Sequence, residues 1–301
     1  MNFLKIGTPF RTIVLPLLVL GLTGKPAIGA VQVAAVTEIA PNVLVFATTS
    51  GNVVASVGPD GALLVGTPSA ASTPQISNML ASRTGSAVRY VIIAPQGLSH
   101  SEGDAGWGRR GAFVSMQENA LERLGGHAMG APSPLPSRLT QIGVDRPHIA
   151  FSEVLSFDLN GDAIHVVHQA PGYSNADAVV HWHVANLIYL GEVFPGDGYP
   201  EIDPDQGGKL DGLVNALNPW TANTVRIVPA RGAMTNGADV KAFRDMIVTI
   251  RDRVQRMIDA GRTEQQVLAE HPTAEFDARW GQGRVPANAF VHAIYGALKA
   301  P

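Results

Sequence analysis

The stretch VRYVIIAPQGLSHSEGDAGW, residues 88–107, decides how the rest of the chain is arranged. Residues 90–93 are apolar and rich in β-branched side chains, which predicts a buried strand. A loop with several Gly and Ser residues follows and contains Ser99 and His100. Because a loop that leaves a buried strand is a common place for binding and catalytic side chains, we expect the functional site here.

The first 30 residues have the features of an export signal. Lys5 and Arg11 precede an apolar run, TIVLPLLVLGLT, at residues 12–23. The small residues at 28–30 provide a plausible cleavage site. The run is shorter than the roughly 20 residues that cross a membrane. We therefore expect an exported protein, periplasmic or secreted, whose mature domain covers residues 31–301 and has no membrane span.

Composition excludes several classes of function. The chain has 22 basic and 25 acidic residues, and the predicted signal holds three of the basic ones and no acid, so the mature part carries a formal charge of −6. A net negative chain argues against nucleic acid as a partner. The absence of Cys excludes disulfides, thiolate metal ligands and a Cys nucleophile.

Local patterns predict layers of strands and helices, an α/β fold class. Apolar runs predict strands at residues 43–47, 53–57, 62–65, 112–114, 178–183, 186–190 and 225–228. Asn160-Gly161 predicts a tight turn between strands at 149–159 and 163–168. Helices are expected at residues 74–82, 118–124, 210–217, 238–260, 263–269 and 288–298, with Thr73 capping the first and Asn236 the long one.

In order and spacing, these segments resemble the metallo-β-lactamase fold family over nearly the whole mature chain. The resemblance implies a four-layer αβ/βα sandwich with its site at one edge between two sheets, and a helical C-terminal tail at residues 237–301. The segments that carry it include Gly51-Asn52-Val53, Gly61-Ala62-Leu63-Leu64-Val65, Leu159-Asn160-Gly161, Gly198-Tyr199-Pro200, Gly207-Gly208 and the run from Pro272 to Trp280.

The resemblance also implies where a zinc site would lie, and most of its ligands are missing. In register, the family's His-x-His-x-Asp-His motif keeps only its last His, and the Asp that usually ends the third strand of the meander is Gly66. Two further His ligands and the bridging Asp are replaced as well. The former metal-site positions hold Pro95, Gly97, Ser99, His100, Tyr173, Glu192 and Arg231.

These replacements predict a site without the usual zinc pair, and we expect no cofactor. A zinc site needs three or four protein ligands, whereas His100 and Glu192 supply at most two. Arg231 brings a permanent positive charge to the place of a cation. We expect Arg231 to pair with Glu192 and Tyr173 to fill the vacated space. Changing Arg231 to His and Glu192 to Asp should not restore zinc, because Pro95, Gly97 and Tyr173 still lack donors.

Two chemical alternatives remain open. In a metal-free hydrolase, Ser99 would be the nucleophile, His100 the base and Glu192 the group that orients it, with Arg231 as the oxyanion partner. In a relocated metal site, the ligands would come from His100, Glu192, His168 and His181, or from the histidines of the strands around Tyr173. His181 and His183 share a face of a strand, while His165 and His168 point to opposite faces.

The favoured function is therefore a non-catalytic or weakly catalytic homologue that binds a small molecule or a partner in the former active-site cleft. The Gly-, Pro- and Ser-rich segment at residues 125–147 would form one wall. The alternative is a working hydrolase of lactam, lactone, ester or thioester bonds, either metal-free or with a single metal. The sequence leaves the substrate and the oligomeric state open.

Overall fold

The computed structural model of the protein describes residue 33 and residues 35–66, 72–85, 87–93, 107–123, 148–222 and 224–299. The predicted export signal, the loop with Ser99 and His100, and the predicted wall at residues 125–147 lie outside these residues. No helix in the described part is long and apolar enough to cross a membrane.

The first sheet follows the chain order. Its first four strands are antiparallel and pair as a meander, and β4 then begins a parallel half that continues to β7. The strands are β1 (Ala35–Ala40), β2 (Val43–Thr48), β3 (Gly51–Gly58), β4 (Gly61–Val65), β5 (Val88–Ile92), β6 (Phe113–Gln117) and β7 (His148–Phe151).

The second sheet is mostly antiparallel, with one parallel pair between β11 and β12. Its order is β13-β12-β11-β10-β9-β8. The strands are β8 (Val154–Leu159), β9 (Asp162–His168), β10 (Ala178–Trp182), β11 (Leu187–Gly191), β12 (Arg226–Pro229) and β13 (Thr235–Asn236). At the β8–β9 turn, Asn160 and Gly161 both have positive φ, as the sequence predicts.

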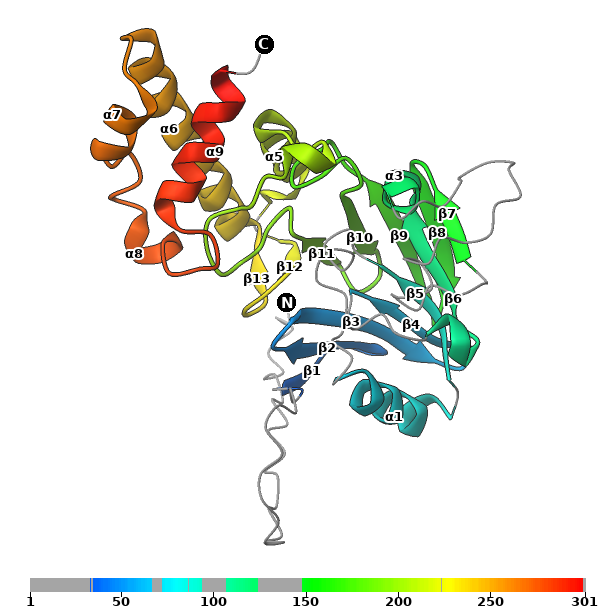
Figure 1. Ribbon diagram of the computed structural model, residues 1–301. Helices are drawn as coiled ribbons and strands as arrows, with labels where there is room; N and C mark the ends of the chain where they lie inside the picture. The colour runs from blue at the N-terminus through cyan, green and yellow to red at the C-terminus, as the bar shows by residue number, and fades with distance from the viewer. Residues whose placement is uncertain are drawn as a thin grey trace, which may run out of the picture.

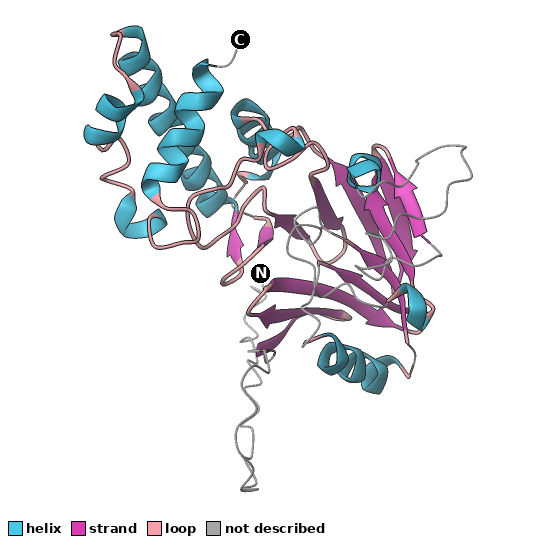
Figure 2. Ribbon diagram, viewed as in Figure 1, coloured by secondary structure: helices cyan, strands magenta, loops and turns pink. Residues whose placement is uncertain are grey.

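Helices cover the outer face of each sheet (Figures 1 and 2). α1 (Thr73–Thr84) and α3 (Glu118–Arg123) contribute to the core on the outer side of the first sheet, and the later helices pack on the second. These are α5 (Leu210–Leu217), α6 (Gly237–Asp259), α7 (Glu264–Ala269), α8 (Asp277–Trp280) and α9 (Ala287–Lys299). Short 3₁₀ turns lie at η1 (Gly108–Arg110), η2 (Pro204–Gln206) and η3 (Asn218–Trp220).

Three hydrophobic clusters fill the spaces between the layers. The cluster between the sheets contains Val54 and Ile92 from the first sheet and Trp182 and Tyr189 from the second. The outer clusters join the first sheet to α1 and the second sheet to α5, α6 and α9. The helix–sheet–sheet–helix order that the resemblance implies is therefore the observed architecture.

Two local predictions were wrong. The strand expected at residues 149–159 is two strands in different sheets, because the chain leaves β7 at Phe151 and crosses to the second sheet before β8 begins. Helix α1 begins at Thr73, so Ser72 and not Thr73 is its cap residue. Pro74 still lies in the first turn, where its missing N–H costs nothing.

Candidate functional site

The site forms where β11 and β12 end. These strands are parallel neighbours, so their carboxyl ends lie at the same edge of the second sheet. Glu192 directly follows β11, and Arg231 comes two residues after β12. Topology alone therefore brings together two residues that are 39 positions apart in the sequence.

Arg231 lies between two carboxylates. Its two terminal nitrogens donate to the two carboxylate oxygens of Glu192, the Nη2–Oε2 bond measuring 2.7 Å. Its Nε donates to Oδ2 of Asp197 at 2.8 Å. The Arg231 and Glu192 side chains are only 15% and 12% exposed, whereas Asp197 is 31% exposed. The group of Arg231, Glu192 and Asp197, which we call the ion group, has a formal charge of −1.

The ion group keeps Arg231 charged. Burial by itself lowers the pKa of Arg231, but the hydrogen bonds and negative charges of Glu192 and Asp197 outweigh it and raise that pKa above its ordinary value. A buried Arg in this state is stable only when its donors are paired, and three of them are.

The turn that carries Arg231 is held by hydrogen bonds from the first sheet. Asn52, buried at the start of β3, donates from its side-chain amide to the carbonyl oxygens of Pro229 at 3.0 Å and Gly232 at 2.9 Å. Its backbone N–H donates to the oxygen of Ala230 at 2.7 Å. Gly51 has φ +138°, and a Cβ there would lie 2.7 Å from the same oxygen. This close approach explains why the residue before Asn52 is a Gly.

The fourth strand of the meander, β4, also ends at this edge. Gly66 has φ +94°, and a Cβ at this position would lie 3.2 Å from the hydroxyl of Tyr189. Tyr189 is buried, and burial together with the charge of Glu192 raises the pKa of its phenol. The hydroxyl is therefore neutral at physiological pH and can donate a hydrogen bond.

Tyr173 lies in a loop between β9 and β10 that is ordered by one buried acid. Asp177 accepts hydrogen bonds from the backbone N–H groups of Gly172, Tyr173 and Ser174 and from the Ser174 hydroxyl, at 2.7–3.0 Å. Burial raises the pKa of Asp177 to about 6, although these hydrogen bonds act to lower it. The loop holds Tyr173 almost fully buried.

The described residues of this edge do not fit a zinc pair. Both oxygens of Glu192 accept from Arg231, which leaves that carboxylate already neutralised by a fixed cation. A metal would have to sit against the guanidinium or displace it, and Tyr173 offers no imidazole nitrogen. Across the described chain, no three His, Asp or Glu side chains are already arranged as metal ligands.

The histidines of β9 and β10 divide between the two faces of the second sheet. His168 contacts the backbone oxygen of Asn175 at 3.0 Å, on the side of Ile164 and Val166 that faces the first sheet. His181 is paired in register with His165 and shares the outer face with it. A site that combines His168 with His181 is thus not assembled, and the positions of Ser99 and His100, with Pro95 and Gly97, are outside the described residues.

Sequence reasoning missed Asp197, Asn52 and Asp177. Asp197 occupies a Pro-Gly-Asp-Gly turn, where an acid is usually just a turn residue. The separation of 177 residues between Asn52 and Pro229 gives no local signal at all. Asp177 could have been suspected, because Ser174-x-x-Asp177 is a spacing in which side chains bond nearby backbone groups.

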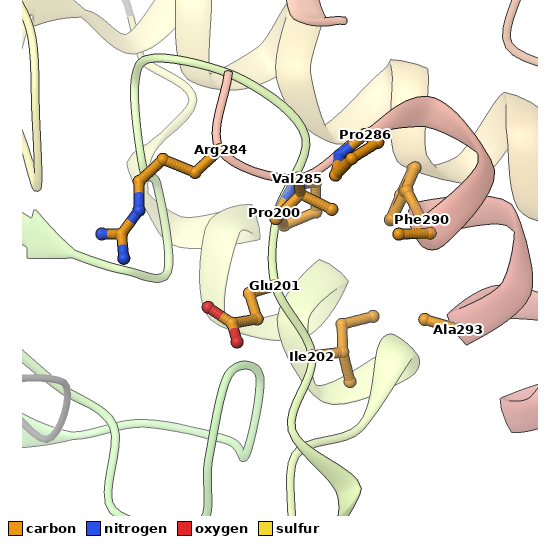
Figure 3. A pocket seen from close by; sticks show the side chains of 9 residues that line it. Pro200, Glu201, Ile202, Arg284, Val285, Pro286, Phe290 and Ala293 are labelled. Atoms are coloured by element: carbon orange, nitrogen blue, oxygen red, sulfur yellow. The ribbon is translucent and has the colours of Figure 1, made fainter. Parts of the chain in front are cut away.

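A separate hollow lies between the loop after Tyr199 and the start of α9. It has a volume of about 350 Å³ and is lined by Pro200, Glu201, Ile202, Arg284, Val285, Pro286, Ala289, Phe290 and Ala293. Figure 3 shows the charged side chains of Arg284 and Glu201 on one side and the apolar side chains of Ile202 and Phe290 on the other. No residue predicted for the site lines it.

Comparisons with known proteins identify the fold through structure rather than sequence. No protein-family profile matches the chain, and no curated protein matches its sequence. Among solved structures, a metallo-β-lactamase from Pontibacter korlensis is similar with a TM-score of 0.52 and 13% identity, over 70% of this chain and 97% of that one. The metallo-β-lactamase IND-7 is similar with a TM-score of 0.53 and 15% identity, over 71% and 97%.

The stereoselective inverting sec-alkylsulfatase Pisa1 from Pseudomonas sp. is similar over more of this chain. Its TM-score is 0.60 with 12% identity, and the match covers 86% of this chain but only 49% of the sulfatase chain. Identities this low establish a common fold and not a common activity. Two facing sheets with helices on their outer faces agree with these structures, and the chain has the metallo-β-lactamase fold.

Proposed function

We propose that this protein is an exported, non-catalytic or weakly catalytic homologue of the metallo-β-lactamase fold that binds a small molecule at the former metal centre. The observation that carries the proposal is the ion group, in which Arg231 is held by Glu192 and Asp197 where the fold's metal ligands would be. An internal cation replaces the metal's charge and leaves the surrounding frame intact.

The ion group also indicates the class of ligand. Because two carboxylates outnumber one guanidinium, this edge repels anions and favours a neutral or cationic molecule. Tyr189 adds a neutral hydroxyl beside Glu192. We therefore propose a neutral or cationic small molecule as the ligand, with hydrogen-bonding groups that face the Glu192 side of the ion group.

The metal-free hydrolase is the competing function, and the state of Glu192 argues against it. To orient a catalytic His, Glu192 would have to accept a hydrogen bond from it and stabilise its positive charge. Both of its oxygens already accept from Arg231, so a fixed cation balances the charge that would stabilise a protonated His. The parent chain and Ser99→Ala are assayed for hydrolysis of ester, lactone, lactam and thioester bonds. Activity of the parent that is lost in Ser99→Ala would establish the hydrolase and refute the proposal.

Zinc uptake tests the loss of the metal centre. The parent chain and a variant with both Arg231→His and Glu192→Asp are dialysed against zinc, and the bound metal is measured. We expect the double variant to hold no more zinc than the parent, because too few donors are present at the other positions. One additional equivalent in the double variant would show that two substitutions are enough to restore zinc binding and would overturn the assignment.

Thermal unfolding tests the ligand class. A panel of neutral, cationic and anionic small molecules is screened for compounds that raise the Tm of the parent chain. A ligand at about one hundred times its Kd stabilises the folded state by about 2.7 kcal/mol. We expect hits among neutral or cationic compounds, and their effect should vanish when Arg231 and Glu192 are replaced together by Met and Leu. Hits confined to anions, or unaffected by that variant, would contradict the proposal.

A further inference from the structure

Three histidines form a cluster on the outer face of the second sheet, away from the ion group. His165 and His181 are direct partners across the β9–β10 ladder. His183 directly follows β10, and its backbone N–H donates to Ala163 at 3.1 Å, which continues the ladder by one step. Residues 181 and 183 lie on the same face because side chains alternate along a strand. The strand register therefore brings three imidazoles onto one patch.

The three rings are in contact. A nitrogen of His183, Nε2, lies 3.0 Å from Nδ1 of His165, and the ring centroids of this pair are 4.5 Å apart. The ring of His181 packs against that of His183 with a centroid distance of 3.9 Å. His183 is exposed and the other two are half-buried, so solvent and ions reach the cluster.

The contact between His165 and His183 already has the features of two metal ligands. A hydrogen bond between two imidazole nitrogens requires one of them to lack a proton, and a lone pair of this kind is what a metal takes. Two nitrogens bound to one tetrahedral zinc at about 2.0–2.1 Å stand roughly 3.3 Å apart. The observed 3.0 Å therefore has to open by only a few tenths of an ångström.

One carboxylate and one aromatic ring lie beside the cluster. The buried carboxylate of Asp162 accepts from the N–H groups of Val184 and Ala185, which directly follow His183, at 2.8 and 2.9 Å. Its negative charge acts on His181, but burial and the two neighbouring histidines outweigh it and lower the pKa of His181. On the other side, the ring of Trp220 contacts that of His181, with centroids 6.1 Å apart. The indole nitrogen of Trp220 is buried and has no hydrogen-bond partner.

We propose that His165, His181 and His183 bind one divalent transition-metal ion of the kind that imidazole prefers, for which Zn²⁺ is the probe, at a site distinct from the former metal centre. His165 and His183 open slightly around the ion, and His181 rotates from its packed position to supply the third nitrogen. Water completes the coordination. The rotation is required because His181 is packed on His183 in the described conformation, where no three His, Asp or Glu side chains are placed to hold a metal.

Zinc titration by calorimetry of the purified chain and its variants tests this site. The parent should bind one equivalent, and His165→Asn and His183→Asn should each weaken binding by about tenfold or more, since even outer partners of a metal are worth that much. The control variants are His168→Asn, which removes a histidine of the opposite sheet face, and His292→Asn, which removes an exposed histidine of α9. Both should bind zinc like the parent, with circular dichroism confirming that each variant folds.

The outcomes separate this site from the former metal centre. No binding by the parent refutes the cluster and leaves the proposed function untouched. Binding that survives His183→Asn but is lost in His168→Asn places the ion on the inner face, which refutes both proposals. If a variant does not fold, the parent decides: paramagnetic Cu²⁺ should broaden the ring resonances of three histidines together, and broadening of none or of unrelated ones overturns the site.

Discussion

Replacing Glu192 by Gln is the sharpest test of the ion group. The substitution keeps the shape of the side chain but removes its charge, which leaves Arg231 with Asp197 as its remaining acidic partner. The two bonds that Glu192 accepts are charge-assisted, and such bonds contribute about 1.5–3 kcal/mol each. Because the amide oxygen of Gln still accepts one of them, we expect the free energy of unfolding to fall by about 2–4 kcal/mol.

The matched control is Asp197→Asn, which also removes one carboxylate from Arg231. Asp197 makes a single bond to Arg231, and its side chain is 31% exposed against 12% for Glu192, so water replaces much of what is lost. We expect a loss of only about 0.5–1 kcal/mol for this variant.

Urea unfolding followed by Trp fluorescence measures both changes. With an m value of about 3 kcal/mol/M, Glu192→Gln should lower the midpoint by roughly 1 M and Asp197→Asn by roughly 0.3 M or less. Replacing Arg231 and Glu192 together by Met and Leu should recover most of the loss, since a buried ion pair is often no more stabilising than an apolar pair. Equal losses for the two single variants would refute the view that Arg231 depends mainly on Glu192.

Two further predictions concern pH and glycine packing. The raised pKa of Asp177, about 6 against an ordinary 3.8, means that the folded state binds this proton more tightly than the unfolded state does. The corresponding stability of about 3 kcal/mol is fully present below about pH 4 and is lost as pH rises through 6, so Asp177→Asn should flatten the pH profile of unfolding in that window. Gly212→Ala in α5 should destabilise by about 1–3 kcal/mol or more in thermal unfolding, because its Cβ would lie 1.8 Å from the carbonyl oxygen of Pro171. Gly296→Ala in α9 meets nothing within 4 Å and should instead stabilise by up to about 1 kcal/mol, and a similar response of both glycines would contradict the packing.

Elements with strong local signals could be predicted from the sequence. The bounds of α5 agree with the expected residues 210–217, and Asn236 caps α6 by accepting from the N–H of Ala238 at 2.8 Å. The apolar positions of α6 face the core, as their 3.6-residue spacing predicts. By contrast, β1 was missed because half of its residues are exposed and its sequence lacks apolar alternation, as is common for a strand at the edge of a sheet.

The site could be predicted only in part. The pairing of Arg231 with Glu192 was predicted from the family resemblance, which places both residues at former metal-ligand positions, and the structure confirms that the two side chains meet. Asn52 and Asp197 could not be assigned by the same means, because their contacts depend on how the two sheets face each other and on a tight turn. The catalytic roles suggested for Ser99 and His100 stay predictions.

The two ends of β3 have a consequence for how the protein unfolds. At its first end, Asn52 bonds the turn after β12, and near its other end Ser56 accepts from Asn160 of the β8–β9 turn at 3.1 Å. Asn160 also donates to the oxygen of Gly61 at 3.0 Å, and its backbone N–H donates to Asp60 at 2.8 Å. One strand thus couples the sheets at both of its ends. Amide protons of β3 and β9 should therefore exchange with the same free energy of opening, as members of a single cooperative unit.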